Sequence, residues 1–186
     1  MPPPLHAGLF RRISALLQRD AHSSENDEVR SVVRLRAHDA CEYCLLPTIG
    51  TFNIEHIIPP DRWDDYVNGR LPGVPFRVGR GGPHHIENYA WSCPYCNRRK
   101  GQTVSLGIGK KATRIFDPRH DHWPDHFVFL DGSIYIYIVG VSAEGAATER
   151  ALGFNAGGIE GPLGARHVAI RERRYPPLWA RRAYEL

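Results

Sequence analysis

The sequence predicts an α+β protein, and three observations support that fold class. A chain of 186 residues, 42% of them hydrophobic, is long enough to form one globular domain with its own core. Apolar residues recur at helical spacing near the N-terminus and alternate with polar residues further along. Between these regions, two C-x-x-C pairs flank two short strand-like runs, which indicates a small core held by its cysteines.

The helices expected first lie in the N-terminal part. Residues 7–19 carry apolar side chains along one side of a helix. A second helix is expected over 25–39, with Ser24 and Asp27 as its start signal. A short strand, 51–58, and a long loop, 59–86, rich in Pro, Gly and Asp, follow.

The second half of the chain begins with a strand over 87–92. A helix then starts with Ser92 as N-cap and weakens at Gly101. Asp131-Gly132, between two alternating apolar runs, predicts a β-hairpin. Two loops and a short basic closing helix complete the expected elements; the loops span 142–148 and 155–164.

The four cysteines form two knuckles, Cys41-x-x-Cys44 and Cys93-x-x-Cys96, separated by 52 positions. Four thiolates at this spacing fit a tetrahedral structural zinc with no position open for water. The competing interpretation is a thioredoxin-like redox pair, which needs only one C-x-x-C and leaves the second unexplained.

Charge is distributed unevenly in this chain, whose net charge is +4. Between Asn88 and Phe116 there are six basic residues and no acid. Such a basic stripe is suited to binding a polyanion such as nucleic acid. On the charge pattern alone, however, a solvent-exposed face without a ligand is the simpler interpretation. The basic residues are Arg98, Arg99, Lys100, Lys110, Lys111 and Arg114.

No stretch approaches the ~20 apolar residues of a membrane span, and no obligate protein partner is indicated. The N-terminus has arginines within its apolar stretch and no small-residue cleavage site, so a secretory signal is not expected. It is Arg-rich like a transit peptide, but Pro2-Pro3-Pro4 argues against one. A cytoplasmic location is expected.

An acid and a histidine, Glu55-His56, stand where a strand would favour Val or Ile, and polar residues follow at fixed places downstream. Together these motifs resemble the HNH endonuclease family, in the branch whose ββα-metal core is held by a zinc on two C-x-x-C pairs. The resemblance covers about residues 30–101 and extends through 116–127 and the hairpin to about 155. Its residues are Cys41, Cys44, Glu55, His56, Asn88, Cys93, Cys96, Asn97, Lys100 and Gly101.

The resemblance implies a fold and roles for these residues. The fold would be a ββα-metal (HNH) core stapled by a four-cysteine zinc, with N-terminal helices and a C-terminal β-hairpin extension. His56 would be the general base, and Glu55 and Asn97 would hold one Mg²⁺ or Mn²⁺ ion at the scissile phosphate. Asn88 would hold the loop and orient His56. The family more often has Asp or His at the position of Glu55.

Elementary chemistry agrees with those roles. Histidine accepts a proton near neutral pH, and carboxylate and amide oxygens are the donors that Mg²⁺ prefers. Asn97 and Lys100 share a helix face beside the cysteines, and Arg98, Arg99 and Lys100 are placed to contact a phosphate backbone. The expected substrate is DNA, with RNA left open. Because neighbours on a strand face opposite ways, Glu55 and His56 serve one site only where the strand twists or ends.

The expected organisation has three parts: an N-terminal helical segment, 1–28; a nuclease core, 29–115; and an extension, 116–186, packed on the core. His84 and His85 are expected to be solvated loop residues. A cluster of histidines and aspartates is expected to pack around Trp123 without a metal; it comprises His120, His122, His126, Asp117, Asp121 and Asp125. The tail arginines could bind DNA, but docking of the tail through its aromatic residues is favoured; these residues are Arg171, Arg173, Arg174, Arg181, Arg182, Tyr175, Trp179 and Tyr184.

Two other functions compete with a nuclease. A zinc-containing nucleic-acid-binding module would keep the cysteines and basic residues but would not need Glu55, His56 and Asn97 together. A redox-responsive protein would need reactive, accessible thiols.

Overall fold

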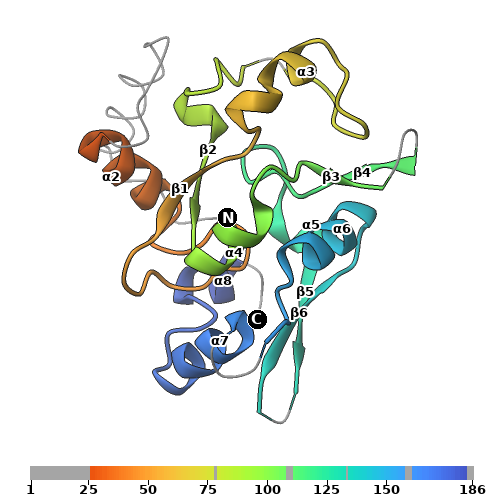
Figure 1. Cartoon of the computed structure of the whole chain (residues 1–186). Helices are drawn as coiled ribbons and strands as arrows, with labels where there is room; N and C mark the ends of the chain where they lie inside the picture. Colours follow the sequence, from red (N-terminus) through yellow and green to blue (C-terminus); the bar gives the residue numbers. More distant parts are fainter. Residues whose placement is uncertain (1–25, 78, 108–110, 133, 158–160, 184–186) are drawn as a thin grey trace.

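The computed structural model describes residues 26–77, 79–107, 111–132, 134–157 and 161–183. Within these ranges it is a mixed α+β structure with three separate two-stranded antiparallel sheets (Figure 1). The expected helix over 7–19 lies outside the described residues. The elements in chain order are α2 (Asp27–Arg36), β1 (Asn53–His56), η1 (Pro60–Arg62), α3 (Trp63–Val67), η2 (Ile86–Asn88), β2 (Tyr89–Ser92), α4 (Pro94–Lys100), β3 (Ser105–Leu106), β4 (Thr113–Arg114), α5 (Trp123–His126), β5 (Phe127–Asp131), β6 (Ile136–Gly140), α6 (Ala143–Leu152), α7 (Pro162–Arg171) and α8 (Leu178–Ala183).

The predicted second helix is present as α2, but it begins one turn later than Ser24. Asn26 caps it, because its Oδ1 accepts hydrogen bonds from the amides of Glu28 and Val29, at 2.8 and 3.3 Å. Its valines are buried, including Val32 and Val33. The helix therefore anchors the chain to the core just before the first knuckle.

The central unit is the β1–β2 sheet followed directly by α4. β1 and β2 pair with Glu55 opposite Ala90 and His56 opposite Tyr89. β1 ends at His56, two residues before the end of the strand predicted over 51–58. All four residues of β2 are buried, and α4 packs against both strands (Figure 1).

The residues at the two ends of α4 explain where the helix begins and where it ends. Cys93, rather than Ser92 as predicted, is the N-cap: its Sγ accepts the amide of Cys96 at 3.4 Å. Pro94 occupies the first turn, where its missing N–H costs nothing. Gly101, with φ of 46°, ends the helix as predicted.

The hairpin prediction is confirmed by β5 and β6, but Asp131-Gly132 is not its two-residue turn. Asp131 remains in β5 opposite Ile136, and the Gly132 amide donates to the Tyr135 carbonyl at 2.9 Å. The connection is therefore longer than the dipeptide suggests.

The loop predicted over 142–148 is wrong, because this segment starts α6. Ser142 caps the helix by accepting the Gly145 amide at 2.9 Å, and the alanines that follow favour helix. Gly145 is required there by packing, since a Cβ would lie 2.0 Å from the His126 carbonyl oxygen. Likewise, α7 begins inside the second predicted loop, and η1 and α3 lie within the long 59–86 loop. η2 begins at the last residue of that loop and takes the first two residues of the strand predicted over 87–92, so β2 starts at Tyr89.

One hydrophobic cluster joins the predicted core, 29–115, to the predicted extension, 116–186, and runs from Val29 through the cysteines to Ala180. The Tyr175 hydroxyl donates to the Cys44 carbonyl at 3.0 Å, and Trp179 packs against the same cluster. The docked-tail prediction is confirmed for these two residues; Tyr184 lies outside the described residues. Within the described ranges, no helix combines the length and apolar character that crossing a membrane requires.

Candidate metal centre and adjoining polar site

The four cysteines form a compact cluster. The sulfur atoms of Cys41, Cys44, Cys93 and Cys96 all lie within 4.8 Å of one another, and every one of these residues is buried. The Cys44 and Cys93 sulfurs are 3.8 Å apart, close to the ~3.8 Å between two sulfurs bound at ~2.3 Å to one tetrahedral zinc. That separation is far beyond the ~2.05 Å of a disulfide. The cluster can hold a structural metal such as zinc.

The electrostatics of the cluster also suit a cation. Burial raises the pKa of Cys41, but hydrogen bonds from the other three thiols outweigh it and lower that pKa well below its usual value. The pKa values of Cys93 and Cys96 are raised well above normal, first because of their hydrogen bonds to Cys41. A thiolate at one cysteine thus disfavours ionisation of the neighbouring buried thiols, and a bound divalent cation would relieve that repulsion.

The first knuckle is held in place from both sides. The Cys41 amide donates to the Leu46 carbonyl at 2.8 Å, closing the turn. The Glu42 amide donates to the Trp91 carbonyl at 2.9 Å, and Glu42 Oε2 accepts the Trp91 amide at 2.7 Å. These paired bonds fix the first knuckle against β2, which leads directly into the second.

Beside this cluster, Glu55 is committed to an ion pair with Lys100. The Lys100 Nζ lies 2.9 Å from Glu55 Oε1 and donates to the His56 carbonyl at 2.7 Å. Lys100 is 1% exposed and Glu55 8% exposed. Burial raises the pKa of Glu55 and lowers the pKa of Lys100, and their mutual attraction offsets these shifts only in part.

His56 faces a second histidine. Its Nε2 lies 3.2 Å from Nδ1 of His84, and its ring packs edge-on against Tyr89 with centroids 5.0 Å apart. Burial first, then the charges of His84 and Lys100, lowers the pKa of His56 to about 4. The imidazole is therefore neutral at neutral pH, as a proton acceptor must be.

The sequence did not predict a role for His84. It is exposed, as expected of a loop residue, but its ring is directed at His56. The feature of the sequence that could have indicated a role for His84 is its position between Gly81-Gly82 and Asn88, four residues before the asparagine. His85, also expected to be solvated, is instead 6% exposed, and a Cβ on Gly81 would lie 2.3 Å from its ring.

Asn88 is fully buried and ties two segments together. Its Oδ1 accepts the Ile58 amide at 2.9 Å, and its Nδ2 donates to the Ile58 and Pro83 carbonyls at 2.7 and 2.8 Å. It therefore holds the chain leaving β1 against the loop that carries His84. Its contacts with His56 are indirect, through the backbone that follows it.

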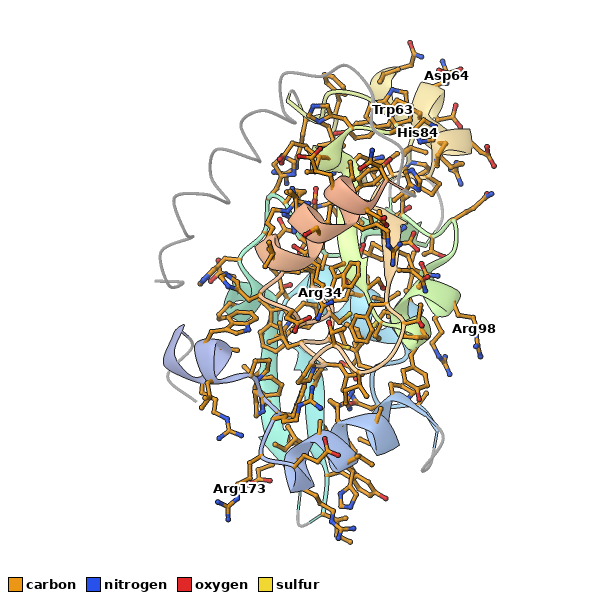
Figure 2. All side chains as sticks on the ribbon, turned by 90° about the vertical axis from the view of Figure 1, so that its left-hand side faces the viewer. Arg34, Trp63, Asp64, His84, Arg98 and Arg173 are labelled. Carbon is orange, nitrogen blue, oxygen red and sulfur yellow. The ribbon has the colours of Figure 1, made fainter. Side chains whose placement is uncertain are left out.

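The remaining predicted site residues lie on α4. Asn97 is partly exposed and one turn before Lys100, on the helix that contacts β1. Arg98 and Arg99 are exposed, and Arg98 extends away from the body in Figure 2. Lys100 differs from its predicted place at the surface, because its ammonium is enclosed by Glu55 and backbone carbonyls.

The predicted basic stripe is not continuous. Arg114 makes ion pairs with Asp121 and Glu144, and only Arg98, Arg99 and Lys111 of the six are exposed among the described residues. Lys110 lies outside those residues.

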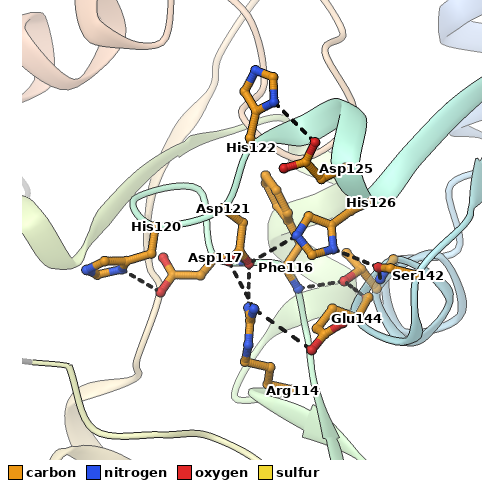
Figure 3. A network of polar contacts seen from close by, with 12 residues as sticks. Arg114, Phe116, Asp117, His120, Asp121, His122, Asp125, His126, Ser142 and Glu144 are labelled. Atoms are coloured by element: carbon orange, nitrogen blue, oxygen red, sulfur yellow. Dashed lines mark hydrogen bonds and ion pairs between the residues drawn. The ribbon is translucent and has the colours of Figure 1, made fainter.

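The histidine–aspartate cluster is a structural polar network (Figure 3). Asp117 pairs with Arg80 and with His120, the latter at 2.9 Å, and His126 Nδ1 lies 2.7 Å from Ser142 Oγ. Trp123 is buried and donates to the Tyr43 carbonyl at 2.9 Å. The predicted hydrogen bonding is confirmed for Asp117, His120, Asp121 and His126. His122 and Asp125 instead pair with each other at the surface, with side chains 62% and 71% exposed.

Comparisons of the chain with protein-family models, with curated proteins and with solved structures found no match. Its chemistry must therefore be argued from the arrangement itself. In that arrangement the neutral imidazole of His56 meets His84 and the carboxylate of Glu55 pairs with Lys100. The amide of Asn97 lies on α4, which contacts β1.

Proposed function

We propose that this protein is a metal-dependent endonuclease of the HNH type, which hydrolyses phosphodiester bonds in DNA. The observation that carries the proposal is the position of His56, at the end of β1, beside a helix that presents Asn97 and with its loop held by Asn88. A nuclease needs a proton acceptor next to an oxygen-rich cation site and a path for phosphate.

His56 is the proposed general base. Hydrolysis requires removal of a proton from the attacking water, and His56 offers a partly exposed imidazole that is neutral at neutral pH. Its pKa of about 4 makes it a weaker base than a free histidine. Asn88 supports this role by fixing the backbone after β1, so that the base and the downstream loop keep their relative positions.

Glu55 and Asn97 are the residues that would hold Mg²⁺ or Mn²⁺. Both supply hard oxygen donors, which fit such an ion. When bound, the ion would stabilise negative charge on the phosphate and on the departing 3′-oxygen. Because Glu55 is paired with Lys100 in this structure, cation binding must exchange with that ion pair. By the resemblance to HNH endonucleases, the products would carry 5′-phosphate and 3′-hydroxyl ends.

Arg98 and Arg99 are the proposed phosphate contacts. They project from the exposed side of α4, one and two residues after Asn97. Each would contribute an electrostatic contact independent of base sequence.

A plasmid relaxation assay tests the proposal. The zinc-loaded protein should convert supercoiled DNA to nicked or linear forms with Mg²⁺ or Mn²⁺ and lose this activity in EDTA. His56→Ala should be inactive yet retain its fold and DNA affinity. His122→Ala is the matched control, because this histidine is exposed and lies in the separate network (Figure 3). Equal inertness of the wild type and His56→Ala across divalent ions would overturn the proposal.

The Lys100–Glu55 pair favours a second candidate, a non-catalytic zinc-containing nucleic-acid-binding module. In that protein the carboxylate would serve only to neutralise a buried ammonium. It would bind DNA through Arg98 and Arg99 without cutting it. DNA binding with no relaxation under any divalent ion would establish this alternative.

A further inference from the structure

The two imidazoles at the end of β1 meet nitrogen to nitrogen. Nε2 of His56 and Nδ1 of His84 are 3.2 Å apart, and their ring planes are nearly perpendicular at 81°. His84 is exposed (Figure 2). Two ring nitrogens therefore converge at a position that solutes can reach.

Both rings stand on well-fixed backbone. Lys100 donates to the His56 carbonyl, and the His56 ring packs against buried Tyr89. On the other side, Asn88 donates to the carbonyl of Pro83, the residue directly before His84. The pair is thus held in position by contacts that do not involve either ring nitrogen.

We propose that His56 and His84 form a second metal site, which takes a transition-metal ion such as Zn²⁺ or Ni²⁺ and is separate from the four-cysteine cluster. Two nitrogens bound at ~2.0–2.1 Å to one tetrahedral zinc lie about 3.3 Å apart, which matches the observed separation. Neutral imidazole is a favoured ligand for zinc, nickel and copper, and water completes the coordination.

The consequence for activity rests on the proposed function. A metal ion on His56 occupies the residue that must accept a proton from water, so the site is inhibitory. Mg²⁺ prefers oxygen ligands and does not compete for the two nitrogens. Zn²⁺ or Ni²⁺ would therefore suppress a reaction that Mg²⁺ supports.

Nickel titration of the untagged, zinc-loaded chain tests the site. Calorimetry or equilibrium dialysis should show one nickel ion per wild-type chain beyond the cysteine-bound metal. His84→Ala and His56→Ala should each weaken this binding at least tenfold, whereas His122→Ala should leave it unchanged. Circular dichroism confirms that each variant is folded. Absence of the extra nickel, or equal binding by His84→Ala, overturns the inference.

The relaxation assay then separates this inference from the proposed function. In Mg²⁺, nickel should inhibit the wild type, and His84→Ala should require at least tenfold more nickel for the same fractional inhibition of its own activity. If nickel binds at the two histidines but the protein never cuts DNA, the second metal site is supported and the proposed nuclease function is refuted. If the protein cuts DNA but binds no nickel at the two histidines, the nuclease function is supported and the second metal site is refuted.

Discussion

Lys100 and Glu55 form a buried ion pair, with 2.9 Å between Nζ and Oε1, and the same ammonium donates to the His56 carbonyl. Both pKa shifts disfavour the charged forms, because burial outweighs the attraction between the two groups. A pair of this kind contributes little net stability but is costly to break from one side only.

Removing either partner alone should therefore destabilise the fold. Lys100→Met and Glu55→Gln should each lower the free energy of unfolding by about 3–5 kcal/mol, because one group remains buried without its partner. The double variant should lose less than the sum of the two. Urea denaturation measures all three, with Arg34→Ala, at an exposed pair with Asp39, as a control expected to cost under about 1 kcal/mol. Additive losses would show that the two groups do not interact.

Removal of the metal should unfold much of the chain. Four buried thiols without a cation repel one another once they ionise. Treatment with a strong chelator, or the substitution Cys44→Ser, should therefore lower the melting temperature of the whole fold. Metal analysis should give about one zinc per purified wild-type chain. Full stability and unreactive thiols after complete zinc removal would contradict a structural role.

Asn88→Ala should loosen the backbone after β1. It leaves the Ile58 amide and carbonyl without their side-chain partners, at about 1–3 kcal/mol for each buried group. Amide hydrogen exchange should accelerate at Ile58. Asn88→Asp keeps the acceptor for that amide, so its Ile58 exchange should stay slower than that of the alanine variant. Unchanged protection in Asn88→Ala would refute this role.

Stability should fall in acid through Asp117. Burial raises the pKa of this carboxyl, but the hydrogen bond from His120 and the charge of Arg80 outweigh it and hold the pKa below its usual value of 3.8. A group whose folded pKa is depressed contributes stability above its unfolded pKa and loses it as pH falls through the folded value. The loss should therefore begin near pH 4 and grow below it.

Urea denaturation at pH 7 and at several values below 4 measures this effect. Asp117→Asn should be less stable at pH 7 by about 3 kcal/mol and should show a shallower decline in acid. Asp125→Asn, at an exposed carboxyl beside His122, should follow the wild type. If the stability of Asp117→Asn falls with decreasing pH as steeply as that of the wild type, groups other than Asp117 cause the loss of stability in acid.

Arg98→Ala with Arg99→Ala should weaken DNA binding without changing sequence preference. Each lost phosphate contact should reduce the slope of log K against log salt by about 0.9. Fluorescence anisotropy at several salt concentrations measures this, with Arg173→Ala as the exposed control on the opposite part of the molecule (Figure 2). An equal effect of Arg173→Ala would place the DNA elsewhere.

The elements around the cysteines were predictable because their signals are local. The two cysteines of a C-x-x-C pair are always three residues apart, and a single glycine is enough to predict where a helix ends. The valine spacing of α2 and the alternation in β5 and β6 are equally local. These signals identified the strands and helix that surround the cluster.

What escaped prediction depends on packing between distant segments. Lys100 looks like a surface residue in a basic run, and only the burial of Glu55 against α4 explains its position. Gly145 suggests a loop until the close approach of α6 to the His126 carbonyl is known. The meeting of His84 with His56 likewise results from backbone contacts of Asn88, which periodicity does not encode.

The hydrogen bond from Tyr175 to the Cys44 carbonyl joins residues 131 positions apart. On a ribosome that adds ~5–20 residues per second, the first knuckle waits on the order of ten seconds for that partner. During this interval its thiols have emerged without their final cover. Metal captured early by these cysteines would therefore protect their thiols from oxidation until synthesis reaches the tail.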